Sequence, residues 1–121
     1  MSNVEFELKV SNKYQSKYQN AKTRGLDFTI TLTSMRNMLK AKRCYYTGIL
    51  MTEPADGGKL RATDRTIDRI DSTKGYVPGN VVACCNAANT LKNMCEGGGI
   101  KGYELGARVL QKTIKHIKKG K

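Results

Sequence analysis

The residues best suited to chemistry lie in one short stretch, residues 64–80, where carboxylates alternate with basic side chains. Asp64, Asp68 and Asp71 occur here, and Asn80 closes the stretch. Carboxylate and amide oxygens are the ligands that hard cations such as Mg²⁺ take in proteins. A divalent cation can neutralise the charge that develops on a phosphodiester during its hydrolysis. The stretch therefore suits a metal site directed at phosphate.

The segments around this stretch must position those side chains. Residues 63–71 are strand-like, residues 72–79 contain turn residues, residues 81–84 are a second apolar strand, and residues 86–94 fit a short helix. Glycine and proline mark the turn, while β-branched residues mark the strands. The order strand, loop, strand, helix predicts a ββα unit.

Helices are expected on both sides of this unit. Residues 14–23 have helical periodicity and end at a glycine, and residues 28–31 form a short β-type run. A second helix starts at residue 31 or 33, where a threonine can cap it, and runs to about residue 42. After a glycine hinge at residues 96–99, a last helix spans residues 103–118.

The last helix has two faces. Its apolar stripe, expected to dock on the core, consists of Tyr103, Ala107, Leu110, Ile114 and Ile117. Its basic stripe, at the same spacing on another face, consists of Arg108, Lys112, Lys115 and Lys119. Cations aligned along a helix can follow a phosphate backbone, so the basic stripe predicts contacts with nucleic acid.

The 121 residues fit a small single α+β domain with a formal net charge of +12. Counts of basic minus acidic residues give 9 − 3 = +6 for residues 1–43, 6 − 5 = +1 for residues 44–95 and 7 − 2 = +5 for residues 96–121. A balanced core between basic flanks favours a polyanionic partner, and the motifs described below favour nucleic acid, DNA first, with RNA left open. No run approaches the roughly 18 apolar residues of a membrane span, and no signal-peptide layout precedes residue 10. We therefore expect a cytoplasmic protein with no membrane partner.

The ββα stretch resembles the HNH, or His-Me finger, endonucleases, in particular small phage or homing types with an Asp-Arg-Ile-Asp motif. The likeness covers roughly residues 44–92, and the segments that carry it are Ile67-Asp-Arg-Ile-Asp71, Lys74-Gly-Tyr76, Gly79-Asn80, Cys84-Cys85 and Asn89-Thr-Leu-Lys92. The resemblance implies a central ββα-metal unit, a metal-dependent nuclease activity and a phage-encoded protein that acts in the host cell.

The resemblance also implies roles for four residues. Asp68 takes the place of the family's metal-binding strand carboxylate, and Asn89 the place of the His or Asn that completes the Mg²⁺ or Mn²⁺ site from the helix. Asn80 matches the middle Asn, which ties the loop together. Arg69 stands where most of the family has the general-base His. Further contacts to nucleic acid are expected from Arg65, Lys74 and Lys92, beside the basic stripe of the last helix.

Arginine stays protonated in proteins and cannot accept a proton from water. Arg69 is therefore expected to contact the scissile phosphate instead, and the base is left open among Asp71, a tyrosine such as Tyr46 or Tyr76, and hydroxide. For Asp71, an ion pair with Arg69 or with Lys74 and a place at the metal both remain open. His116, among lysines, is expected to face solvent or phosphate.

The cysteines mark a second departure from the family. Many relatives bind structural zinc with two Cys-x-x-Cys knuckles, whereas here residues 44–47 and 85–88 each begin with a cysteine and lack the second one. We therefore expect no structural zinc and interpret Cys44, Cys84, Cys85 and Cys95 as reduced, small apolar residues.

Two functions follow from the sequence. The first is a metal-dependent HNH-type endonuclease that nicks DNA or, as a homodimer, cuts both strands. The alternative is a catalytically degenerate HNH-fold protein that only binds DNA.

Overall fold

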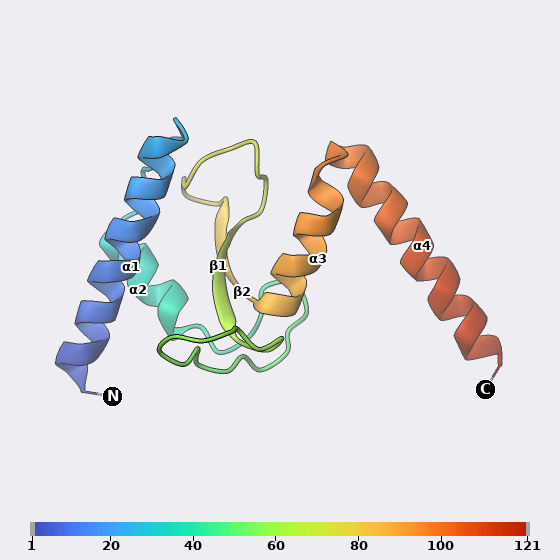
Figure 1. The fold of residues 1–121 in the computed structure, drawn as a ribbon, viewed down its shortest axis with the longest axis horizontal. Helices are drawn as coiled ribbons and strands as arrows, with labels where there is room; N and C mark the ends of the chain where they lie inside the picture. The colour runs from blue at the N-terminus through green and yellow to red at the C-terminus, as the bar shows by residue number, and fades with distance from the viewer. Residues whose placement is uncertain (1, 121) are drawn as a thin grey trace.

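A computed structural model describes residues 2–120. It contains, in chain order, the helices and strands α1 (Asn3–Thr23), α2 (Leu32–Lys40), β1 (Arg65–Arg69), β2 (Val81–Cys85), α3 (Asn86–Glu96) and α4 (Gly99–Lys119). The two strands form a central hairpin, with α1 and α2 on one side and α3 on the other (Figure 1). The predicted α+β fold with a ββα unit is thus confirmed. None of the helices within residues 2–120 has the length and apolar character needed to cross a membrane.

Helix α1 begins at Asn3, well before the predicted start at residue 14. Ser2 caps it, because its Oγ accepts a hydrogen bond from the backbone N–H of Glu5 at 3.1 Å. Phe6 and Val10 continue the apolar stripe of Tyr14 toward the N-terminus and pack into the core. The polar residues between these positions make the helical periodicity weak in the sequence.

Helix α2 keeps close to its predicted bounds. Thr31 caps it through a 3.1 Å hydrogen bond from the backbone N–H of Ser34. The helix ends at Lys40 rather than near residue 42, because the backbone of Ala41 is already extended. Met35 is fully buried and anchors α2 in the core.

The hairpin is antiparallel, and its register pairs Arg65 with Cys85 and Arg69 with Val81. The predicted strand at residues 28–31 is reduced to one parallel bridge between Phe28 and Tyr76. Around this bridge, the rings of Tyr14, Tyr18 and Tyr76 contact Phe28 with centroids 5.2 to 5.6 Å apart. This aromatic cluster fixes the loop between the strands against α1.

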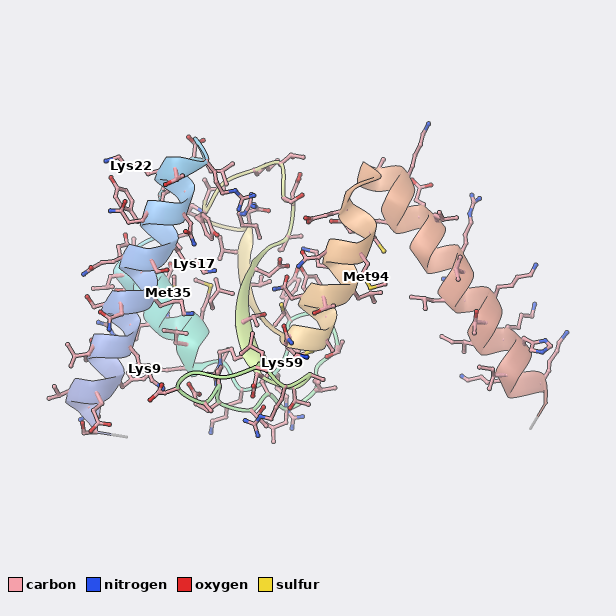
Figure 2. The ribbon with its side chains drawn as sticks, viewed as in Figure 1. Lys9, Lys17, Lys22, Met35, Lys59 and Met94 are labelled. Atoms are coloured by element: carbon pink, nitrogen blue, oxygen red, sulfur yellow. The ribbon has the colours of Figure 1, made fainter. Side chains whose placement is uncertain are left out.

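Helix α4 departs most from expectation. Its apolar stripe does not dock on the core: no residue of α4 is buried, and Leu110, Ile114 and Ile117 are exposed. The helix packs only against α3, after the turn at Gly97 and Gly98, and points away from the rest of the molecule (Figure 1). In Figure 2 its side chains extend along its length with no neighbouring element beside them. The amphipathic pattern had correctly predicted a helix but not a partner for it.

Candidate active site

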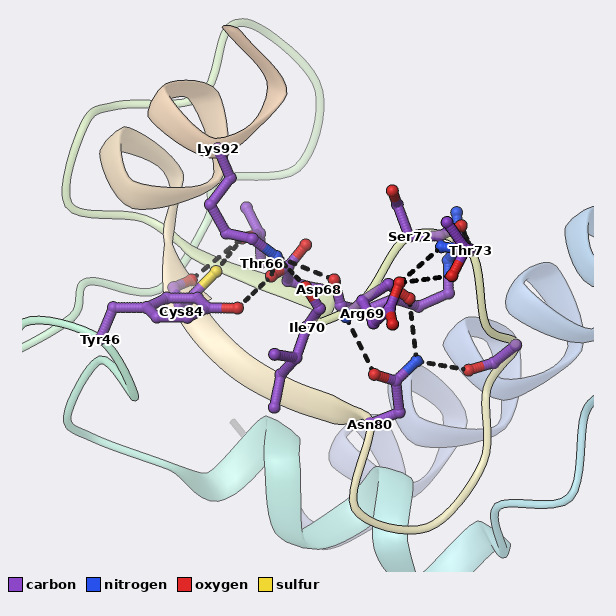
Figure 3. A network of polar contacts seen from close by, with 12 residues as sticks. Tyr46, Thr66, Asp68, Arg69, Ile70, Ser72, Thr73, Asn80, Cys84 and Lys92 are labelled. Atoms are coloured by element: carbon purple, nitrogen blue, oxygen red, sulfur yellow. Dashed lines mark hydrogen bonds and ion pairs between the residues drawn. The ribbon is translucent and has the colours of Figure 1, made fainter. Parts of the chain in front are cut away.

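Asp68 is the centre of the candidate site. It lies on β1, and its side chain is only 10% exposed. Its Oδ2 accepts two hydrogen bonds of 2.6 Å each, one from Lys92 Nζ on α3 and one from the Tyr46 hydroxyl (Figure 3). Asp68 is therefore held firmly between a cation and a phenol.

Lys92 makes more than an ion pair. Its ammonium also donates to the backbone carbonyls of Arg69 at 2.9 Å and Ile70 at 3.0 Å, and it lies 5.2 Å from the centre of the Tyr46 ring. The side chain is 16% exposed. The expectation that Lys92 contacts nucleic acid is therefore not met in this conformation, because the ammonium points inward to Asp68.

Tyr46 acts as a hydrogen-bond donor at this site. Burial first, then the hydrogen bond to Asp68 and the charge of that carboxylate, raise the pKa of the Tyr46 phenol well above its usual value. The phenol keeps its proton at neutral pH and cannot serve as a base in this arrangement. Tyr76, the other tyrosine considered for that task, is only 5% exposed and belongs to the aromatic cluster.

Arg69 is bound to the loop that follows β1. Its Nη1 donates to the carbonyls of Ser72 at 2.7 Å and Lys74 at 2.8 Å, and its guanidinium lies 5.5 Å from the centre of the Tyr76 ring. These contacts show a loop-closing role that the sequence did not predict. A phosphate contact by Arg69 would have to use the donors that face away from the loop.

Asn80 ties the same loop together, as the resemblance implies. Its Oδ1 accepts from the backbone N–H of Asp71 at 2.9 Å, and its Nδ2 donates to the carbonyls of Asp71 at 3.1 Å and Gly75 at 2.9 Å. The side chain is buried. The backbone N–H of Ile70 also donates to the Asn80 carbonyl at 2.8 Å. Asn80 therefore fixes the backbone whose carbonyls accept hydrogen bonds from Lys92.

Asp71 is held by the loop residue that lies two positions after it. Its Oδ1 accepts from the N–H and the hydroxyl of Thr73, at 3.0 and 2.6 Å. These hydrogen bonds, more than the charges of Lys74 and Arg69, lower the pKa of the Asp71 carboxyl. Within residues 2–120 it forms no ion pair within 4.0 Å, so of the two roles left open for Asp71 the pairing with Arg69 or Lys74 is not formed, and a place at the metal stays open.

Asn89 lies on α3 three residues before Lys92, and residues at that spacing share a helix face. Residues 2–120 contain no cluster of three or more His, Cys, Asp or Glu side chains that could hold a metal ion. The oxygen atoms that accept hydrogen bonds from Lys92 nevertheless suit a hard cation, because one carboxylate and two carbonyls already surround a positive charge. A metal here would take Asp68, Asn89, backbone oxygens and water.

Two lysines near Asp68 were missed as parts of the site. Lys92 belongs to the motif at residues 89–92 and was predicted to bind nucleic acid, whereas its ion pair with Asp68 was not predicted. Lys17 lies on the side of α1 that faces β1 (Figure 2). Burial, followed by the charges of Lys13 and Arg69, lowers the pKa of the Lys17 ammonium, while the charge of Asp68 opposes this effect. No sequence signal pointed to Lys17, because the hairpin and α1 meet only in the folded chain.

The basic residues predicted to bind nucleic acid separate into two groups. Arg65 serves the fold instead: its side chain is 8% exposed and donates to the Ala41 carbonyl at 2.9 Å and to Glu53 at 2.6 Å. Two of its donors are thus used within the chain, and a contact of Arg65 with nucleic acid stays a prediction. The side chains that remain exposed and available for phosphate are Lys74, Arg108, Lys112, Lys115 and Lys119, with His116 beside them on α4.

Three of the cysteines are buried, and Cys95 is half-buried. Burial tends to raise the pKa of the Cys44 thiol, but hydrogen bonds from Thr47 and from the backbone of Cys85, Thr47 and Tyr46 together lower it to about 7. Burial raises the pKa of the neighbouring Cys84 thiol to about 11. Thr47 stands at the position of the second cysteine of a Cys-x-x-Cys knuckle, and it is one of the groups that lower the pKa of the Cys44 thiol.

Comparison with known proteins identifies the fold. The chain superposes on the rare-cutting HNH restriction endonuclease PacI with a TM-score of 0.53, over 84% of this chain and 76% of that one, at 24% sequence identity. The protein has an HNH-type fold. This confirms the fold that the motif at residues 67–71 predicted, while no family model matches the sequence.

Two viral proteins share sequence with the HNH-type chain. One is an uncharacterised 29.0 kDa protein of Enterobacteria phage T4, 29% identical over 85 residues, or 70% of this chain. The other is an uncharacterised protein of Acanthamoeba polyphaga mimivirus, 31% identical over 83 residues, or 69% of this chain. The matched segment spans only 32% of the phage protein and 14% of the mimivirus protein.

Proposed function

We propose that this chain is a metal-dependent endonuclease that hydrolyses phosphodiester bonds in DNA, with Asp68 as its metal carboxylate. The observation that carries the proposal is the arrangement around Asp68. A carboxylate on the first strand of a ββα unit, with carbonyls beside it, already surrounds a cation. An HNH-type fold with this feature is best explained by cation-assisted phosphate chemistry. The structural neighbour, a restriction endonuclease, is consistent with it.

Asp68 and Asn89 would hold Mg²⁺ or Mn²⁺, which supplies Lewis-acid stabilisation of the charge on the phosphate. The chain's own residues prepare the site. Tyr46 holds Asp68 Oδ2 through a 2.6 Å hydrogen bond. Arg69 and Asn80 fix the loop after β1, which sets the direction of the two carbonyls. The attacking water would lose its proton to solvent hydroxide or to a group other than Tyr46, whose phenol stays protonated.

The DNA would be held mainly by the basic flanks. The exposed cations of α4 lie on a helix that stands apart from the core, where a phosphate backbone can reach them. Each phosphate contact makes binding more sensitive to salt, because it adds about −0.9 to the slope of the log binding constant against the log salt concentration. Lys74, on the loop beside the site, would add a contact near the scissile phosphate.

A second function is DNA binding without cleavage. It is favoured by one specific observation: the ammonium of Lys92 already binds Asp68 Oδ2, the oxygen that the proposed metal ion would use. Arg69 in place of the usual base, with Nη1 bound to the loop, points the same way. The basic flanks would serve this function equally well.

A plasmid assay separates the two. Supercoiled DNA is incubated with the protein in Mg²⁺, in Mn²⁺ and in EDTA, and nicking is compared among wild type, Asp68→Asn, Asn89→Ala and Asp56→Asn, an exposed loop control. Metal-dependent nicking by wild type and Asp56→Asn, reduced at least 100-fold in the two site variants, supports the endonuclease. If no protein nicks while all shift DNA in a gel, the endonuclease is rejected and the binding function is supported.

A further inference from the structure

Three oxygen atoms from consecutive residues converge on one ammonium. Lys92 Nζ lies 2.6 Å from Asp68 Oδ2, 2.9 Å from the Arg69 carbonyl and 3.0 Å from the Ile70 carbonyl. An ammonium has three donors, so all three are used. An exposed lysine can donate all of its hydrogen bonds to water. Lys92 instead loses much of its rotamer freedom by donating to three protein oxygens.

The positions of these three oxygen atoms are set by the backbone of the strand and not by Lys92. Arg69 is the last residue of β1, and the next residue, Ile70, is held by its N–H to the Asn80 carbonyl at 2.8 Å. The carbonyls of Arg69 and Ile70 therefore keep their direction whether or not Lys92 is present. Carboxylate and backbone carbonyl oxygens are also the ligands of hard divalent cations.

We propose that Lys92 is a tethered cation that occupies the Asp68 site and must leave it before a divalent metal ion binds. The proposal rests on the proposed function of Asp68 as metal carboxylate. The two cations exclude each other because like charges on one carboxylate oxygen repel strongly in a site that is shielded from water. Lys92 thus raises the metal concentration that is needed to fill the site.

The test measures Mn²⁺ binding to the full chain without DNA, by the loss of the free Mn²⁺ signal in electron paramagnetic resonance. Wild type is compared with Lys92→Met, with Asp68→Asn and with Lys59→Met, an exposed loop control. Competition predicts that Lys92→Met binds Mn²⁺ about tenfold more tightly, since no fraction of the site is occupied by the lysine. Lys59→Met should match wild type, and Asp68→Asn should bind far more weakly.

Equal or weaker Mn²⁺ binding by Lys92→Met, with wild-type binding still dependent on Asp68, overturns the competition but leaves the metal site of the proposed function intact. If wild type and Lys92→Met bind no more Mn²⁺ than Asp68→Asn, the metal site itself is refuted, and the competition with it.

A measurement on wild type avoids any dependence on the folding of Lys92→Met. In ¹H–¹⁵N spectra of the lysine ammonium groups, hydrogen bonding slows proton exchange and makes the Lys92 signal observable. Saturating Mg²⁺ should abolish or shift this signal with the same midpoint as metal binding. A Lys92 signal that stays unchanged through saturation contradicts the competition.

Discussion

Asn80→Ala tests the claim that one amide holds the loop beside the candidate site. The substitution removes three hydrogen bonds, of 2.9, 3.1 and 2.9 Å, to the backbone of Asp71 and Gly75. A net contribution of about 1 kcal/mol each gives a loss of about 3 kcal/mol. Water does not readily replace these bonds, because the Asn80 side chain is 7% exposed. With a slope of about 1.5 kcal/mol/M, the urea midpoint should fall by about 2 M.

Urea unfolding followed by far-ultraviolet circular dichroism measures this loss. Asn93→Ala, an exposed site on α3, is the matched control and should change the free energy of unfolding by less than about 0.5 kcal/mol. Asn80→Asp should cost at least as much as Asn80→Ala, because a carboxylate would face the carbonyls of Asp71 and Gly75. A loss below about 1 kcal/mol for Asn80→Ala would refute the reasoning, since the loop would then be held by other contacts.

The other predictions concern packing and pH. Gly75→Ala would place a Cβ 2.2 Å from the backbone oxygen of Asp27, so unfolding measurements should show a loss of about 3 kcal/mol, whereas Gly97→Ala, with open space around it, should be near neutral. The pKa of Cys44, about 7 in the folded chain, lies below the unfolded value of about 8.5. The stability that its thiolate adds is thus full above about pH 8.5 and lost as pH falls through about 7. The free-energy difference between wild type and Cys44→Ala should therefore grow from pH 6 to pH 9, and a flat difference would contradict the low pKa.

The central unit could be predicted from sequence because its signals are local. Two short runs with β-branched residues, separated by a segment that contains glycine and proline, leave few arrangements other than a hairpin. The helix at residues 86–96 follows directly, so its contact with the hairpin needed no long-range information. The bounds of β1 and β2 accordingly lie within a few residues of the predicted ones.

The position of α4 could not be predicted by the same reasoning. An amphipathic pattern shows which face of a helix is apolar but not which surface covers it. Gly97 and Gly98 turn the chain after α3, and the direction they give carries α4 away from the hairpin. Its exposed apolar side chains, Leu105 and Ile114 among them, are a consequence of that turn and not of composition.

The site shows a similar limit. The motif located Asp68 and Asn80, whose roles depend on their own loop, but it did not show the partners that arrive from elsewhere. Tyr46 comes from a segment 22 residues before Asp68, and Lys92 lies 24 residues after it. Such pairings depend on how α3 and the knuckle segment pack on the hairpin, and no spacing in the sequence specifies that packing.

The structure divides the positive charge of the chain between folding and binding. In the nearly balanced middle segment, Arg65, Arg69 and Lys92 all donate to oxygen atoms of the same chain. On α4, the basic side chains form no ion pair within the described residues and remain exposed. The proposed DNA binding and the proposed chemistry at Asp68 would therefore rely on different cations. Under our proposals, an endonuclease and a pure binding protein would share the same basic helix. They would differ only in the cation bound to the oxygen atoms at Asp68, a metal ion in the first and Lys92 in the second. The displacement of Lys92 therefore decides between the two functions.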